Sequence, residues 1–295
     1  MKYLNYILML GLVVMAGCKP KSAAPEAGAK TYAARGIVRQ IADDRHTATI
    51  QHEAIPGYMS AMTMDFSVKN TNELNGIAAA DEITFKLVVG ETDSWIEGVQ
   101  LVAHHIENAV TNAPAVQTLS AELKPGDPLP DCELVMEDGS PARFSDFRGR
   151  VVALTFFFSR CPLPDYCPRM NKNFSEARKL MLSTPDAPTN WLLLSISFDA
   201  DFDNPQVLSS YARLYRGDDS NHWLFAAAPT NSLARLAPGL DLMIMRKDGN
   251  IMSHNLRTVV LDPQGRIYRQ LDGKEWTPQQ LAGAMLEAAR PPAQP

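Results

Sequence analysis

The fold of this 295-residue chain is constrained most by two nearly uninterrupted apolar runs, Val151–Phe158 and Trp191–Phe198. A strand that is apolar at almost every position is buried on both faces, as in the centre of a sheet covered by helices. Helical patterns are predicted at four places, namely 171–182, 205–215, 232–236 and 278–289. The alternation of strands and helices over residues 124–291 predicts an α/β layer fold with a mixed sheet.

The region before residue 108 has a different pattern, in which short runs are separated by turn signals. Five runs of strand-forming residues are recognised, at 32–41, 47–52, 62–68, 82–89 and 95–102. No segment here has the period of a long helix, and Pro56-Gly57 is one of the turn signals. Five short strands within residues 31–107 predict a small all-β domain, an OB-like barrel. Residues 108–123 are predicted to be the linker to the second domain.

The first segment of the chain has the features of an export signal. Lys2 gives it a positive start, and the apolar stretch Ile7–Met15 is too short to span a bilayer as a helix. It ends in Met-Ala-Gly-Cys18, which resembles a bacterial lipobox, so residues 1–17 are predicted to be a lipoprotein signal peptide. Cys18 would carry the lipid, residues 18–30 would form a tether, and the protein would be anchored to the membrane on the periplasmic face of the cell envelope. An uncleaved anchor and an ordinary signal peptide are the alternatives.

Charge and cysteine content narrow the range of functions. The net charge is −5 and there is no long basic run, which argues against nucleic acid as a partner. Without Cys18, three cysteines remain: Cys132, Cys161 and Cys167. In an oxidising compartment an odd number does not suggest a framework of disulfides alone, so a functional pair with one spare thiol is favoured.

One histidine and three methionines form the first set of candidate ligands, the methionine–histidine group: His52, Met59, Met62 and Met64. Met62 and Met64 alternate on one predicted strand, so their side chains point to the same face. Thioethers and imidazole are soft ligands that suit Cu(I), and thioethers, unlike thiols, cannot pair into a disulfide. The alternative is that these methionines only fill the interior of the barrel.

This segment resembles the periplasmic CusF-like copper-binding domains, which are small β-barrels. That family has a histidine on one strand and a Met-x-Met pair on the next, and His52, Met62 and Met64 match those positions. The tryptophan that packs over the metal in the best-known form of the family has no match in the loop here. Three residues are candidates for the remaining contact to the metal. Met59 is favoured as a ligand, and Tyr58 or Trp95 could instead cover the metal through a cation–π contact.

The second set of candidate ligands is the dithiol–histidine group: Cys161, Cys167 and the distant His254. Both cysteines follow a predicted buried strand and precede a helix, where the backbone dipole favours the thiolate form of a thiol. Two thiolates and an imidazole form a soft three-ligand site that suits copper. From the residues alone, a structural disulfide, a thioredoxin-type redox pair and a zinc site stay open, and His254 could be an ordinary loop histidine.

The surroundings of this group resemble the Sco/SenC family of copper chaperones over about residues 122–291. The shared motifs are Pro125-Gly-Asp127, Phe144-Ser-Asp-Phe-Arg-Gly149 and Ser197-Phe-Asp199. The resemblance implies a thioredoxin-like fold and a copper site at the dithiol–histidine group. It also implies delivery of copper, or of reducing equivalents, to the dinuclear copper centre of cytochrome c oxidase. One departure is that five residues separate the two cysteines, where the family usually has three.

Five further residues near these groups have two interpretations each. Asp165 either raises the pKa of the neighbouring thiols or only helps to form a turn. Cys132 is predicted to be a buried and inert thiol, with a resolving role as the alternative. Met243, Met245 and Met252 are predicted to pack in the core, with an auxiliary copper role as the alternative.

Both groups suit the same soft ion, so the sequence predicts an exported copper chaperone rather than an enzyme. The expected client is the copper-centre subunit of cytochrome c oxidase. A flexible linker over residues 108–123 spans about 20–25 Å. We therefore expect the methionine–histidine group to pass Cu(I) to the dithiol–histidine group, or to store the ion beside that group. The alternatives are a thiol–disulfide oxidoreductase that reduces the copper-ligand cysteines of the oxidase, and a copper-sequestration protein without a client.

Overall fold

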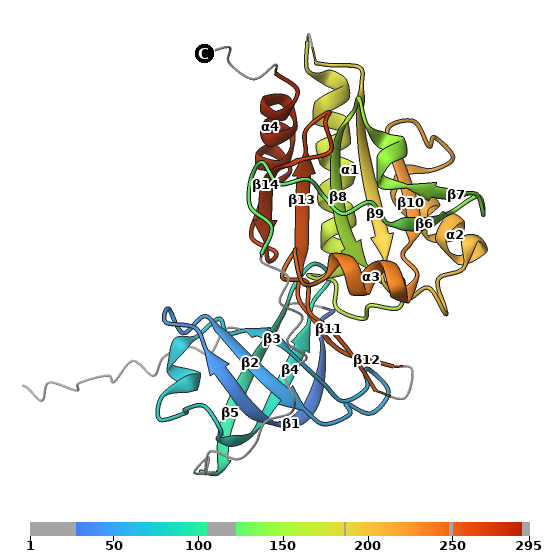
Figure 1. Cartoon of the computed structure of the whole chain (residues 1–295). Coiled ribbons are helices and arrows are strands. Elements are labelled where there is room, and N and C mark those ends of the chain that lie inside the picture. The colour runs from blue at the N-terminus through green and yellow to red at the C-terminus, as the bar shows by residue number, and fades with distance from the viewer. Residues whose placement is uncertain (1–27, 105–121, 186, 248–249, 291–295) are drawn as a thin grey trace, which may run out of the picture.

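The computed structural model describes residues 28–104, 122–185, 187–247 and 250–290, which contain two main sheets (Figure 1). We refer to the described residues before 105 as the N-terminal domain and to those after 121 as the C-terminal domain. Cys18, the predicted signal peptide and most of the predicted linker lie outside the described residues. Within the described ranges, no helix is both long enough and apolar enough to cross a membrane.

Five antiparallel strands form the sheet of the N-terminal domain. In chain order they are β1 (Lys30–Ile41), β2 (Thr47–His52), β3 (Met62–Ser67), β4 (Glu82–Val89) and β5 (Ser94–Ala103). Their order in the sheet is β3-β2-β1-β4-β5, and Val68, next to β3, forms a parallel bridge with Ile96 of the opposite edge strand. Buried and more exposed residues alternate along β2 and β3, as expected for strands with one face on a core. The prediction of a small all-β domain is confirmed.

Gly36 marks the closest approach of β1 and β2. It lies opposite His52, and a Cβ atom added at this position would lie 2.6 Å from the carbonyl oxygen of Gln51 and 2.8 Å from the Cα of His52. Only glycine leaves room for this contact between the two backbones. The position of His52 on the sheet therefore depends on a residue without a side chain.

Seven strands form the sheet of the C-terminal domain, in the order β14-β13-β8-β9-β10-β6-β7. Their bounds are β6 (Glu133–Met136), β7 (Pro141–Arg143), β8 (Val151–Phe157), β9 (Trp191–Ser197), β10 (Trp223–Ala227), β13 (Arg257–Leu261) and β14 (Ile267–Asp272). The central strands β8, β9 and β10 are parallel, and every residue of β8 and β9 is buried. The two buried strands predicted from the apolar runs and the mixed sheet predicted from the alternation of strands and helices are both confirmed.

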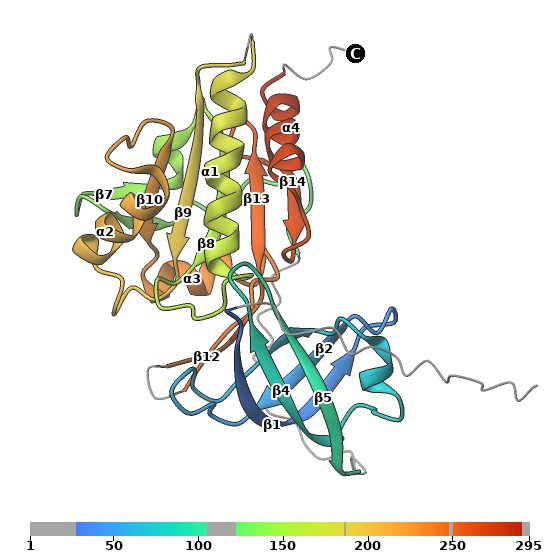
Figure 2. The same ribbon diagram turned by 180° about the vertical axis from the view of Figure 1, so that it is seen from behind.

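The helices of this domain are α1 (Cys167–Ser183), α2 (Pro205–Arg216), α3 (Thr230–Leu236) and α4 (Pro278–Ala288). Figure 2 shows α1 and α4 side by side over one face of the sheet. A proline in the first turn of α1, α2 and α4 fixes where each helix begins, and α4 adds a capping box between Thr277 and Gln280. This arrangement is the α/β thioredoxin-like fold that was predicted for the C-terminal part.

A hairpin of two further strands, β11 (Ile244–Lys247) and β12 (Asn250–His254), lies outside both main sheets. It leaves the C-terminal domain and runs along the N-terminal domain, where β12 lies beside β3 (Figures 1 and 2). The sequence analysis did not predict this hairpin. It brings the strand that ends at His254 close to the strand that begins at Met62.

We expect Gly36→Ala to destabilise the N-terminal domain by about 1–3 kcal/mol, because the added methyl group would push apart the backbones of β1 and β2. Urea unfolding followed by circular dichroism measures the loss. The control is Gly283→Ala in α4, where an added Cβ meets no atom within 4 Å. This control should leave stability unchanged or raise it by about 0.5–1 kcal/mol. Equal stabilities of the two variants would contradict the close contact at Gly36.

Candidate metal centres

In the dithiol–histidine group, Cys161 lies on the loop that joins β8 to α1, and Cys167 is the first residue of α1, at the carboxyl end of the central parallel strands. The ring of Pro164 does not fit the interior of a helix, and α1 begins only at Cys167, with a proline in its first turn. Cys167 is fully buried and Cys161 is half-buried. The loop therefore places one sulfur inside the domain and the other nearer its surface.

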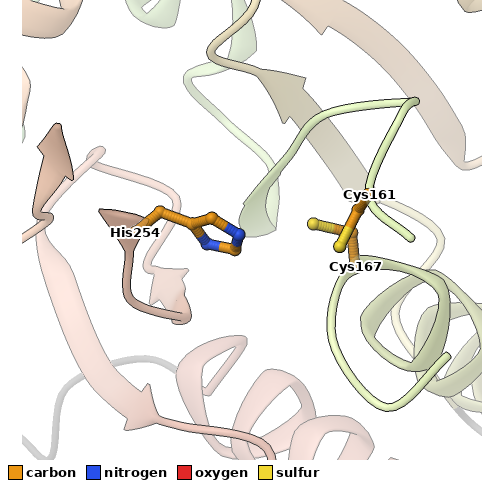
Figure 3. Close-up of side chains that lie close together, drawn as sticks. All are labelled: Cys161, Cys167 and His254. Atoms are coloured by element: carbon orange, nitrogen blue, oxygen red, sulfur yellow. The ribbon is translucent and has the colours of Figure 1, made fainter. Parts of the chain in front are cut away.

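His254 ends β12 and meets the cysteine loop within a cluster of aromatic rings. Its imidazole packs edge-on against Phe158 and Tyr166, with centroid distances of 5.4 and 5.8 Å, and tilted against Phe198 at 5.3 Å. The residue is only 9% exposed. One of its ring nitrogens points toward the two sulfur atoms (Figure 3). Sequence reasoning did not identify this aromatic cluster, since its members come from three separate segments.

The three side chains of the group converge. The Sγ atoms of Cys161 and Cys167 and a ring nitrogen of His254 all lie within 4.8 Å of one another. Burial by itself raises the pKa of Cys161, but hydrogen bonds from Cys167 and His254 and the charge of His254 outweigh burial and lower it. Burial and the neighbouring Cys161 raise the pKa of Cys167. The site thus combines two sulfur atoms with an imidazole, a set that can bind a soft metal ion or undergo thiol–disulfide exchange.

Three members of the methionine–histidine group share one buried face of the N-terminal sheet. His52 pairs directly with Met62 across β2 and β3, and Ile50 pairs with Met64 two residues further along. His52 is 2% exposed, and both methionines are buried as well. The register therefore brings one imidazole and two thioethers to the same side of the strand pair.

The imidazole of His52 has a free nitrogen. Its Nδ1 lies 2.6 Å from the carbonyl oxygen of Glu53, and because a carbonyl only accepts, Nδ1 carries the proton. Burial lowers the pKa of His52, which keeps the ring neutral. Its Nε2 is buried and has no hydrogen-bond partner within the described part of the chain. A buried lone pair without a partner is unfavourable, and a soft cation bound there would offset that cost.

A cavity of about 150 Å³ lies where the two domains meet. Met59 and Met62 line it from the N-terminal domain, and Phe158, Arg160 and Pro162 line it from the C-terminal domain. Met59 is buried and faces the same cavity as Met62, as its predicted role as a ligand requires. That role itself stays a prediction.

The two aromatic alternatives to Met59 have other partners. The ring of Tyr58 stacks on Tyr32, with 4.3 Å between centroids, and its hydroxyl donates a hydrogen bond to the carbonyl oxygen of Pro162. The ring of Trp95 carries the ammonium group of Lys69 at 3.2 Å from its centroid. These contacts favour Met59 over either aromatic ring as the additional contact to copper.

Of the five residues with two interpretations, Asp165 differs most from expectation. It lies in a turn, as one interpretation held, but its carboxylate is buried and is bound by Ser94 and Lys274. Neither partner could be predicted from the sequence, because both lie far from Asp165 in the chain.

Of the same five residues, Cys132 and Met243 differ in burial. Cys132, just before β6, is fully buried away from the other two cysteines, and burial raises its pKa, which fits an inert thiol. Met243 is exposed, so it is not a core residue. The side chains of Met245 and Met252 lie outside the described residues.

Two family models match the chain. The model described as SCO1/SenC matches residues 122–290, more than half of the chain, and the model described as copper binding periplasmic protein CusF matches residues 31–101. The predicted link to copper is confirmed at the level of these families. No curated protein matches the chain.

Several solved structures are similar to this chain. A SCO1/SenC family lipoprotein from Bacillus anthracis has 20% identity and a TM-score of 0.49, over 58% of this chain and 100% of that one. ScoI from Arabidopsis thaliana with copper bound has 16% identity and a TM-score of 0.47, over 54% and 96%. BsSco, described as a member of the Sco family of cytochrome c oxidase assembly proteins, has 19% identity and a TM-score of 0.48, over 56% and 96%.

We expect His254→Ala to raise the pKa of Cys161, because the hydrogen bond and charge of the imidazole favour the thiolate. The thiolate is the reactive form, so the pH profile of alkylation by iodoacetamide should move to higher pH. Mass spectrometry of the Cys161 peptide measures the rate at each pH. His104→Ala, which removes an exposed histidine of the N-terminal domain, is the control and should leave the profile unchanged. The same profile in both variants would contradict the role of His254.

Proposed function

Because the chain belongs to the SCO1/SenC family, we propose that it is an exported copper chaperone with two copper sites. The dithiol–histidine group binds copper in the C-terminal domain, and the methionine–histidine group binds Cu(I) in the N-terminal domain. The observation that carries the proposal is the convergence of three soft donors within 4.8 Å of one another. A thiolate, a thiol that ionises on binding and an imidazole match the preference of copper for soft ligands.

The methionine–histidine group supports a second site with different chemistry. Its donors are neutral, since thioethers carry no charge and burial lowers the pKa of His52. Neutral soft donors favour a monovalent soft ion over Mg²⁺ or Ca²⁺, which require oxygen ligands. The unpartnered Nε2 of His52 supplies the strongest donor of this group.

The compared proteins support a location and a client. The N-terminal match is to a family described as periplasmic, one similar structure is a lipoprotein, and another belongs to cytochrome c oxidase assembly proteins. We therefore assign the chain to the periplasmic face of the cell envelope, anchored through a lipid on Cys18. Its proposed client is the copper-centre subunit of cytochrome c oxidase.

A second candidate function is thiol–disulfide exchange with the copper-ligand cysteines of the oxidase. The observation that favours it is the contrast between the two thiols, since the pKa of Cys161 is lowered and that of Cys167 is raised. A nucleophilic thiolate beside a protonated thiol is typical of redox pairs. This function requires both cysteines but no metal.

The number of Cu(I) ions bound per chain tests each of the two proposed sites independently. The unaltered chain should bind two Cu(I) ions. The His254→Ala variant should bind one ion fewer, and so should the double variant Met62→Leu with Met64→Leu, because the two variants remove donors from different groups. Metal analysis after equilibrium dialysis against a Cu(I) buffer measures the content. Met243→Leu, at an exposed methionine, is the control and should retain both ions. Retention of both ions in His254→Ala would contradict the proposed copper site.

Deletion of the gene for this chain in the organism that carries it distinguishes the chaperone function from the redox function and from copper sequestration. Deletion should lower cytochrome c oxidase activity, and expression of the unaltered chain should restore it whereas the His254→Ala chain should not. Restoration by His254→Ala would favour the redox function, which needs only the thiols. Normal oxidase activity together with reduced copper tolerance would instead favour sequestration.

A further inference from the structure

We propose that Cu(I) passes directly between the two groups through the cavity at the domain interface, while the loop between the two cysteines holds the N-terminal domain in place. This rests on the proposed function, because both groups must bind copper. The N-terminal domain is then a built-in partner of the dithiol–histidine group. Copper moves within a docked pair of domains rather than between two carriers on a flexible linker.

The buried carboxylate of Asp165 is the first tie between the domains. The residue is 1% exposed, accepts a hydrogen bond from the hydroxyl of Ser94 at 2.7 Å and forms an ion pair with Lys274. Ser94 begins β5 of the N-terminal domain, whereas Lys274 lies between β14 and α4 and also donates to Ser67 of β3 at 2.9 Å. A buried carboxylate needs its partners, so this cluster joins the cysteine loop and both domains at one point.

Two tyrosine hydroxyls tie the same loop to the N-terminal domain. Tyr166 donates a hydrogen bond to the carbonyl oxygen of Asp65 on β3, and Tyr58 donates one to the carbonyl oxygen of Pro162 at 3.0 Å. Tyr166 also packs against His254. Pro162, Asp165 and Tyr166 lie among the five residues between the cysteines, so this segment contributes both to the docking of the domains and to the positions of the two cysteines.

The cavity lies where the two domains meet, next to one member of each group. Met59 and Met62 line one side, and Arg160 and Pro162, which flank Cys161 in the chain, line the other. Phe158, which also lines it, packs against His254, and the cavity volume is about 150 Å³. Strand β12, which carries the histidine of the dithiol–histidine group, lies beside β3.

The charge of Arg160 does not block passage through this cavity. Its guanidinium is paired with the buried carboxylate of Asp199 at 2.6 Å and stacks over the ring of Phe202 at 4.1 Å. Both contacts hold the cation in place and balance its charge. The remaining residues that line the cavity are uncharged.

Transfer is an exchange of ligands without a change of oxidation state. Cu(I) leaves the thioethers and imidazole of the methionine–histidine group and binds the sulfur atoms of Cys161 and Cys167 and a ring nitrogen of His254. Each ligand atom that carries a proton releases it to solvent as it binds the ion, and copper remains Cu(I), so no electron donor or acceptor is required. The net change is one ion moved and those protons released, and the anionic sulfur ligands favour the ion at the dithiol–histidine group.

The test combines two kinds of change in the full chain. Met62→Leu with Met64→Leu removes two thioether donors at nearly constant volume. Ser94→Asp places a second carboxylate beside Asp165 and should separate the domains by repulsion. Lys274→Met opens the same interface from the C-terminal domain and replaces Ser94→Asp if that variant fails to fold. All combinations are compared in the presence of one equivalent of Cu(I).

The measured quantity is the rate at which excess bicinchoninate removes Cu(I) from the dithiol–histidine group, followed by the ultraviolet absorption of the thiolate–copper bond. In the docked chain, Met62→Leu with Met64→Leu should slow the removal of copper on the order of tenfold, because the change removes neighbouring donors that act at high effective concentration. In the opened chain, copper leaves directly to solvent, so the same two substitutions should not change the rate. Gln100→Asp puts the same charge at an exposed position of β5 and should behave as the docked chain does.

Either of two results would overturn the proposal. The first is that Met62→Leu with Met64→Leu does not change the rate in the docked chain, and the second is that it changes the rate equally in the docked and opened chains. Absence of the thiolate–copper absorption in the unaltered chain would overturn the proposed function itself. The failure of direct transfer can therefore be distinguished from the failure of copper binding.

Discussion

The buried ion pair between Asp165 and Lys274 is the interaction on which the arrangement of the two domains depends. Removing one partner of a buried pair leaves an uncompensated charge, at a typical cost of about 3–5 kcal/mol. Here the carboxylate also binds Ser94 of the other domain, so separation of the domains would remove one of its two partners. Asp165 lies two residues before Cys167, and this contact therefore also holds the segment that joins the two candidate thiol ligands.

The two candidate copper sites differ in charge and in how their histidines are held. His52 donates Nδ1–H to a backbone carbonyl and keeps a buried Nε2 lone pair beside neutral thioethers. His254 is held by the rings of Phe158, Tyr166 and Phe198 and points a ring nitrogen toward the two sulfur atoms. Thiolates bind soft ions more strongly than neutral thioethers do, so under the proposed function Cu(I) would be held more tightly by the cysteines than by the methionines.

The sequence predicts most of the fold because its signals are local. The apolar runs predicted β8 and β9, and the alternating Met62 and Met64 predicted a strand with both side chains on one face. The hairpin β11–β12 was missed, although Asp248-Gly249 in the sequence between its strands is a common hairpin signal. The partners of Asp165 had no local signal, since contact between its carboxylate and Ser94 exists only once the two domains have docked.

Anomalous diffraction at the copper edge, from crystals of the full chain loaded with two equivalents of Cu(I), tests the central claim most directly. The account predicts two copper peaks on opposite sides of one interdomain cavity. One peak lies among His52, Met62 and Met64, and the other lies among the two cysteines and His254. A single peak, or a second peak on an outer surface of either domain, would contradict it.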